Sequence, residues 1–209
     1  MRFAGRRKLL PINNPANADM ARKEFQVSES TATEVATLGG GCFWCIEAVY
    51  TRMRGVIAAE SGYSGGHLPN PTYKQICGGD TGHVEVVRIT FDPVQVSYRE
   101  ILEVFFTVHD PTTLNRQGND AGTQYRSVIF HHTPAQRATA QALIAEMEAE
   151  RVFSGRIVTA LEPATTFYMA EGYHQRYYGA NAEQPYCQFV VAPKLAKFRH
   201  KFAALVKDA

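Results

Sequence analysis

The chain has 209 residues, of which 45% are hydrophobic and 20% charged, values typical of an ordinary soluble globular protein. This length favours a single domain with a sizeable core. Residues 1–33 hold six basic and three acidic residues, so the remaining chain, with 16 basic and 17 acidic residues, is nearly neutral. Such a body has no basic stripe for nucleic acid, and no apolar run reaches membrane-spanning length.

Residues 1–33 are predicted to form a flexible N-terminal extension, followed by a single domain over residues 34–209. The extension contains Asn-Asn-Pro-Ala-Asn and few aromatic residues, and it has no sustained apolar periodicity. A secretory signal needs a continuous apolar run after its charges, but Leu9-Leu10 is interrupted by Pro11. We therefore expect the protein in the cytoplasm.

The domain begins with a predicted strand that leads into a helix through three glycines. Residues 35–38 indicate a short strand, and residues 39–41 are all glycine. From Cys42 onward, apolar residues recur at helical spacing until Gly55. Because glycine lets the backbone turn sharply, we expect Cys42 at or beside the N-terminus of this helix.

Further strands and helices follow in alternation. Residues 83–91, rich in Val, Ile and Thr, predict a strand. Ser97 and Glu100 form a capping box that opens another helix. The other predicted segments are a glycine-rich stretch (61–66), a short helix (71–77), a long loop (110–123), a strand (125–132), a helix (133–151), a strand (156–161), an irregular segment (163–192) and a last helix (193–206). This order predicts an α+β protein, a two-layer α/β sandwich with a ferredoxin-like plait core and an irregular C-terminal segment.

Four cysteines are too few to build a disulfide scaffold of this size. Cys42 and Cys45 form a Cys-x-x-Cys pair, which in a reducing compartment indicates redox chemistry or metal binding. A zinc site needs four ligands, and Cys77 and His83 are not spaced as a second pair. Cys77 closes a short apolar helix and is typical of a structural thiol. Cys187 lies in a polar, aromatic segment where a thiol can stay mobile, so structural and redox roles both stay open.

Cys42 is the first candidate nucleophile. A thiol at a helix N-terminus experiences the positive end of the helix dipole and unpaired N–H groups, which favour the thiolate. The alternative interpretation is a buried cysteine that acts as a small hydrophobic residue.

Glu85 is informative because of its position in the predicted strand. Alternate residues of a strand share a face, so Glu85 points the same way as Val87, Ile89 and Phe91. Burial on an apolar face raises the pKa of a carboxyl, which can then hold a proton near neutral pH. The alternative is an acid at the rim of the sheet that reaches solvent.

The remaining candidates have ordinary structural explanations when each is taken alone. Asp120 is typical of a turn residue, Tyr73 and Tyr125 of packing aromatics with exposed hydroxyls, and Trp44 of a core residue.

Taken together, these motifs resemble the A class of peptide methionine sulfoxide reductases, over roughly residues 35–202. The nucleophile motif of that family is similar to Gly41-Cys42-Phe43-Trp44. The other matching segments are Gly65-Gly66, Pro71-Thr72-Tyr73, residues 81–87 (Thr-Gly-His-Val-Glu-Val-Val), residues 109–120 (His-Asp-Pro-Thr-Thr-Leu-Asn-Arg-Gln-Gly-Asn-Asp), residues 122–127 (Gly-Thr-Gln-Tyr-Arg-Ser) and Tyr173-His174-Gln175.

The resemblance implies a role for each candidate residue. Cys42 would be the nucleophile that becomes a sulfenic acid as methionine departs. Glu85 would be the proton donor, and Tyr73 and Tyr125 would donate hydrogen bonds to the sulfoxide oxygen.

The substrate side of the resemblance is equally specific. Phe43 and Trp44 would form an apolar slot for the substrate methyl group, and Asp120 would bind water or orient its neighbours. The implied substrate is the S epimer of methionine sulfoxide, free or in peptides. Neither a cofactor nor a metal is implied, the reductant would be thioredoxin, and a monomer is expected.

The residue after Trp44 departs from the commonest form of the motif. Glycine is frequent there in the family, whereas this chain has Cys45. Cys187, in Pro185-Tyr186-Cys187, resembles the C-terminal resolving cysteine of many members. We favour Cys187 as the first resolving thiol, with Cys45 as the alternative and a sequential use of both also open.

Three other functions compete with sulfoxide reduction. A general thiol–disulfide oxidoreductase would use Cys42 and Cys45 but leave Glu85 and Asp120 without a role. A non-catalytic redox sensor would be oxidised at Cys42 without turnover, and a zinc-binding module would hold metal.

Overall fold

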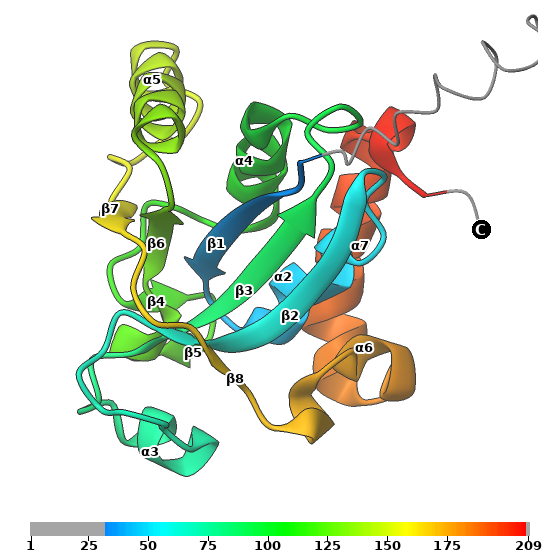
Figure 1. Cartoon of the computed structure of the whole chain (residues 1–209). Helices are drawn as coiled ribbons and strands as arrows, with labels where there is room; N and C mark the ends of the chain where they lie inside the picture. Colours follow the sequence, from blue (N-terminus) through cyan, green and yellow to red (C-terminus); the bar gives the residue numbers. More distant parts are fainter. Residues whose placement is uncertain (1–31, 208–209) are drawn as a thin grey trace, which may run out of the picture. The chain divides into compact units, whose positions relative to one another are not determined.

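A computed structural model describes residues 32–207 of the chain, shown in Figure 1. The predicted N-terminal extension (1–33) lies almost wholly outside the described residues. The strands are β1 (Glu34–Gly40), β2 (Val56–Ser64), β3 (Val84–Phe91), β4 (Arg116–Gln117), β5 (Asp120–Ala121), β6 (Ser127–His131), β7 (Ala160–Pro163) and β8 (Tyr168–Met169). The helices are α2 (Phe43–Tyr50), α3 (Tyr73–Gly78), α4 (Tyr98–Val108), α5 (Pro134–Ala149), α6 (Tyr177–Ala180) and α7 (Ala192–Lys201). Short helical turns are η1 (Thr123–Tyr125), η2 (Gly172–His174), η3 (Cys187–Val191) and η4 (Ala203–Leu205).

Six strands form one mixed sheet in the order β7-β6-β1-β3-β2-β8. Neighbours pair antiparallel except β6 and β7, which run parallel. A separate two-stranded ribbon is formed by β4 and β5. The fold is therefore a mixed α/β arrangement around a central sheet, as the interleaved pattern of the sequence predicts at this level.

The main core lies between one face of the sheet and the helices. Figure 1 shows α2 and α7 behind β2 and β3, and α7 also packs against α4. Val87 and Phe91 of β3 are fully buried in this core. Val84 and Val86 point to the opposite face, where a smaller apolar cluster is covered by Phe167. The predicted parity of β3 is thus confirmed, and Glu85 lies on the helix-covered face.

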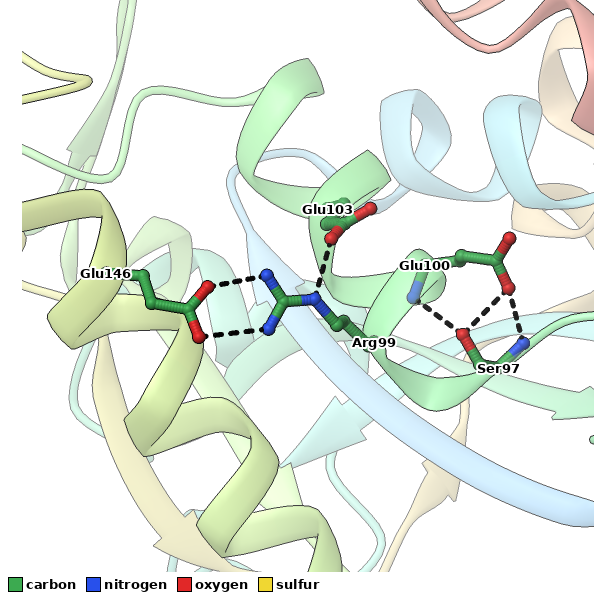
Figure 2. A network of polar contacts seen from close by, with 5 residues as sticks. All are labelled: Ser97, Arg99, Glu100, Glu103 and Glu146. Carbon is green, nitrogen blue, oxygen red and sulfur yellow. Dashed lines mark hydrogen bonds and ion pairs between the residues drawn. The ribbon is translucent and has the colours of Figure 1, made fainter. Parts of the chain in front are cut away.

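The predicted capping box opens α4. The Glu100 N–H donates to Ser97 Oγ at 3.2 Å, and the Ser97 N–H donates back to Glu100 Oε2 at 2.8 Å. Arg99, in the same turn, forms ion pairs with Glu103 on its own helix and with Glu146 on α5 (Figure 2). The distance to Glu146 is 2.6 Å. All three of these side chains are partly exposed, so water screens the network and it contributes little to the stability of the α4–α5 contact.

The largest difference from the sequence prediction is β2, which occupies the stretch assigned there only as glycine-rich. Gly62 lies within this strand, and a Cβ at that position would collide with the Phe167 ring and the Tyr168 carbonyl oxygen. The glycine therefore permits close approach of β8 rather than a turn.

Three further boundaries differ. The strand predicted at 156–161 forms only at Ala160–Pro163, and the long loop at 110–123 contains the β4–β5 ribbon. The segment predicted as irregular, residues 163–192, contains β8, η2, α6 and the π-helix η3. Within residues 32–207, no helix is both long and apolar enough to cross a membrane.

Candidate active site

Cys42 lies at the junction of β1 and α2, as its position after three glycines predicts. It is the N-cap residue of α2, with φ −56° and ψ 124°. The preceding Gly41 has a φ of +92°, and a Cβ there would lie 2.5 Å from Gln117. Glycine is therefore required at this turn for both backbone and space. Cys42 itself is 7% exposed.

Glu85 reaches the same helix end from β3. Its Oε2 accepts a hydrogen bond from the backbone N–H of Phe43 at 3.1 Å, so the carboxyl lies beside Cys42. The side chain is buried, and burial raises the pKa of Glu85 to about 8. The Phe43 N–H opposes this rise, whereas the charges of Asp120 and Cys45 add to it. At neutral pH the carboxyl is mostly protonated and can donate.

The two cysteines of the motif are in contact. Burial, followed by a hydrogen bond to Cys45, raises the pKa of Cys42 well above its usual value. The same hydrogen bond lowers the pKa of Cys45 to about 7. Burial therefore opposes the Cys42 thiolate that the helix N-terminus is expected to favour.

Tyr73 and Tyr125 bring two phenols towards the acid. Tyr73 opens α3 and Tyr125 closes η1, and both are half-buried. Burial, then the charge of Glu85, raises the pKa of each hydroxyl. Both therefore stay protonated as hydrogen-bond donors. Asp120, on β5, accepts a hydrogen bond from the Tyr186 hydroxyl at 2.7 Å.

Phe43 and Trp44 form an aromatic wall next to Cys42. The Phe43 ring is buried, with its centroid 5.9 Å from that of Tyr63. Trp44 stacks on Tyr177 with centroids 3.7 Å apart and ring planes 7° apart. The Trp44 ring also meets Tyr186 edge-on at 5.9 Å. Such a wall suits an apolar group rather than a charged one.

Cys187 occupies a different environment from the one expected. It is fully buried in η3, a π-helix that continues into α7, so the mobile thiol predicted for this segment is wrong. Its pKa is raised first by burial and then by the charge of Cys45. Cys77 is exposed.

Tyr186 and His174 belong to the site but received no role from the sequence. The Tyr186 hydroxyl donates to Asp120, and Tyr186 lowers the pKa of Cys42 slightly against the larger effect of burial. His174 Nδ1 accepts the indole N–H of Trp44 at 3.2 Å. Both residues belong to motifs named in the sequence analysis, Pro185-Tyr186-Cys187 and Tyr173-His174-Gln175. Their partners, however, lie far away in the chain and are visible only in the structure.

A cavity opens beside this cluster. Its volume is about 330 Å³, and its lining includes Asp120, Tyr186 and Lys194. A larger hollow of about 750 Å³ lies at the C-terminal end of α5, around Arg151 and Phe153. Asp120 and Tyr186 of the site line the smaller cavity, whereas the lining of the larger hollow includes no residue of the site, so we place the site beside the smaller one.

Comparison with known proteins decides the family. A family model described as peptide methionine sulfoxide reductase matches residues 34–206. The chain belongs to this family. The resemblance inferred from the motifs is confirmed, and with it an oxidoreductase that reduces methionine sulfoxide.

The relatives of this reductase cover nearly its whole described part. The peptide methionine sulfoxide reductase MsrA of Saccharolobus solfataricus is 57% identical over 174 residues, 83% of this chain and 97% of its own. MsrA of Chromobacterium violaceum is 54% identical over 175 residues, 84% of this chain and 99% of its own.

Two solved structures share the fold. Reduced Mxr1 from Saccharomyces cerevisiae is 35% identical with a TM-score of 0.69, covering 76% of this chain and 91% of that protein. Methionine sulfoxide reductase A of Corynebacterium diphtheriae is 38% identical with a TM-score of 0.64, covering 73% and 77% respectively.

Proposed function

We propose that this reductase acts on the S epimer of methionine sulfoxide, with Cys42 as nucleophile and Glu85 as proton donor. The observation that carries the proposal is the hydrogen bond from the Phe43 N–H to Glu85, which holds a carboxyl of pKa about 8 beside the thiol. A free or a peptide-bound sulfoxide presents the same reacting atoms to this site.

In the first step, the Cys42 sulfur attacks the sulfoxide sulfur while the proton of Glu85 passes to the sulfoxide oxygen. Tyr73 and Tyr125 donate hydrogen bonds to that oxygen as its charge grows. The hydroxyl group then moves to the Cys42 sulfur and the thioether departs. The proton of the original thiol ends on Glu85, so the products are methionine and a Cys42 sulfenic acid.

In the second step, a thiol attacks the sulfenic acid, which releases water and forms a disulfide. The contact between the two cysteines of the motif supports Cys45 as this first resolving thiol, whereas sequence reasoning favours Cys187. The pKa of Cys45, about 7, leaves a large thiolate fraction at neutral pH. Cys187 then attacks Cys45, frees Cys42, and leaves a disulfide whose two electrons are restored by thioredoxin.

Four broader expectations belong to the same proposal. The protein works as a monomer in the cytoplasm, and Asp120 orients Tyr186 towards the site. The strand order β6-β1-β3-β2, with α2 and α4 as the connecting helices, supports a ferredoxin-like plait as the core.

Incubation of the full chain with each purified sulfoxide epimer and dithiothreitol tests the substrate. We expect turnover of the S epimer, little of the R epimer, and none by Cys42→Ser. Equal turnover of the two epimers would contradict the proposed specificity, and lack of turnover of both would contradict the function.

A further inference from the structure

Trp44 is the only tryptophan of the chain, and its ring is restrained on three sides. One face stacks on Tyr177, an edge meets Tyr186, and the indole N–H donates to His174 Nδ1 at 3.2 Å. The stacking permits the indole to slide and turn in its own plane. The directional hydrogen bond to His174 is the contact that fixes the ring within that plane.

The protonation state of His174 follows from this contact. An indole nitrogen can only donate, so Nδ1 must accept and the neutral ring carries its proton on Nε2. Burial lowers the pKa of His174, although the charge of Glu171 opposes the shift. The ring is 1% exposed and packs among Phe43 (centroids 5.1 Å apart), Tyr73 (4.4 Å) and Tyr173 (4.2 Å).

The second ring nitrogen of His174, Nε2, forms no hydrogen bond within the described residues. Nε2 is buried without a hydrogen-bond partner among residues 32–207, and its nearest acidic atom, Glu171 Oε2, is 4.0 Å away. An unsatisfied buried donor costs free energy. An apolar ring of similar size would fill the same space without leaving a buried donor unpaired. The hydrogen bond that Nδ1 accepts from Trp44 is therefore the interaction for which a histidine is needed at this position.

The backbone on either side of His174 is anchored. The Gln175 side chain accepts the Ser61 N–H at 3.0 Å and donates to the carbonyl oxygens of Ser61 and Ala170, each at 2.9 Å. The buried Glu47 carboxyl accepts the Arg176 N–H at 2.8 Å, where Arg176 has a φ of +52°. The imidazole therefore projects from a segment fixed to β2 and α2.

We propose that His174 is a positioning residue that holds the Trp44 indole in one orientation, so that Trp44 and Phe43 form a slot of fixed width for the substrate methyl group. This inference rests on the methyl-slot role of Trp44 in the proposed function. It concerns substrate fit rather than proton transfer, because His174 does not contact Glu85 or either reactive thiol through a hydrogen bond in the described structure.

The physical contact can be tested without turnover. Since one indole N–H exists in the whole protein, a ¹⁵N-labelled sample gives a single indole cross-peak that reports Trp44. In His174→Leu the acceptor is lost, and we expect this peak to shift upfield and exchange faster with solvent. In His174→Asn the amide oxygen occupies the place of Nδ1, so the peak should return towards its wild-type position.

Kinetics then test the consequence. In His174→Leu we expect KM for methionine S-sulfoxide to rise about 2- to 12-fold, the factor for loss of one ordinary hydrogen bond. The single-turnover rate at saturation should change less than twofold. Preference for the sulfoxide of methionine over that of its ethyl analogue should fall, and His174→Asn should restore most of the loss. His200→Leu, an exposed histidine on α7, is the matched control and should match the wild type.

A double-mutant cycle separates positioning from general structure. If His174 acts through the indole, His174→Leu should add almost nothing to the KM of a Trp44→Phe protein. Full additivity, or an indole peak unmoved in His174→Leu, would overturn the proposal. Should His174→Leu fail to fold, His174→Gln, whose oxygen extends to the Nε2 position instead, is expected to show the same loss. An inactive wild-type protein with the expected indole shift would instead count against the proposed function alone.

Discussion

At the scale of single residues, the environment of Glu85 determines the protonation of the site. A carboxyl on the helix-covered face of β3 is removed from water, and its one backbone donor only partly compensates. Its pKa of about 8 places the titration of the proposed acid slightly above neutral pH. The same burial raises the pKa of Cys42, so the substrate-free site holds two protons, one on each reacting group.

The pH dependence follows from the sign of the shift at Glu85. The carboxyl is protonated below its pKa, so the single-turnover rate of sulfenic acid formation should fall as pH rises through about 8. Glu85→Gln cannot transfer a proton, and its rate should be lower by about 10²- to 10⁴-fold. The descending limb should also vanish, as rapid-quench measurements from pH 6 to 10 would show.

Glu85→Asp is a suitable companion variant, because it keeps the carboxyl but shortens its reach. A Glu85→Gln protein that retains the wild-type rate and pH profile would remove Glu85 from the acid role.

At the scale of elements, β2 shows that pairing with neighbouring strands can make a segment of low intrinsic strand propensity adopt a strand. Its run of Ala58, Ala59, Glu60, Ser61 and Gly62 lacks the β-branched residues that favour strands. It pairs with β3 along its whole length and with β8 at Gly62 and Tyr63. The small residues are useful there because β8 and the Phe167 ring approach closely.

Gly62→Ala should therefore destabilise the protein by about 1–3 kcal/mol, since the added methyl group overpacks the β2–β8 contact. Urea unfolding followed by circular dichroism measures the change. Gly179→Ala, in α6, is the control, because a Cβ there meets no atom within 4 Å. Equal free energies of unfolding for the two variants would show that β8 shifts to accommodate the methyl group without loss of stability.

Local sequence signals predict local features well here, and long-range contacts poorly. The three glycines before Cys42, the parity of Glu85 and the Ser97–Glu100 capping box depend on neighbours in the chain, and the structure places all three as expected. The close approach of β8 to Gly62 and the contact of His174 with Trp44 join residues more than 100 positions apart. No periodicity within a short window could reveal them.

At the scale of the whole molecule, the three buried thiols Cys42, Cys45 and Cys187 lie at the start of α2 and in η3. Cys42 touches Cys45, and the charge of Cys45 is felt by Cys187. In the proposed order, the oxidising equivalent taken from the substrate passes from Cys42 to Cys45 and Cys187 in two exchanges.

Disulfide mapping by mass spectrometry after one equivalent of substrate tests this order. In Cys187→Ser we expect a Cys42–Cys45 disulfide and slow recycling by thioredoxin. In Cys45→Ser we expect the Cys42 sulfenic acid to persist at least tenfold longer. Cys77→Ser, which leaves all three thiols in place, should retain a wild-type disulfide map. A Cys42–Cys187 disulfide formed first in the wild type would instead support the order favoured by the sequence.

The hydrogen bond between Trp44 and His174 spans 130 positions of the chain. The proposed nucleophile, Cys42, and the proposed acid, Glu85, both lie in the first half of the protein, whereas His174, which is proposed to fix the slot, lies in the last quarter. During synthesis, the reactive thiol therefore leaves the ribosome long before the residues that enclose it. If the proposed roles hold, the site is complete only once the segment around His174 has docked, which makes catalysis a late event in the maturation of each new molecule.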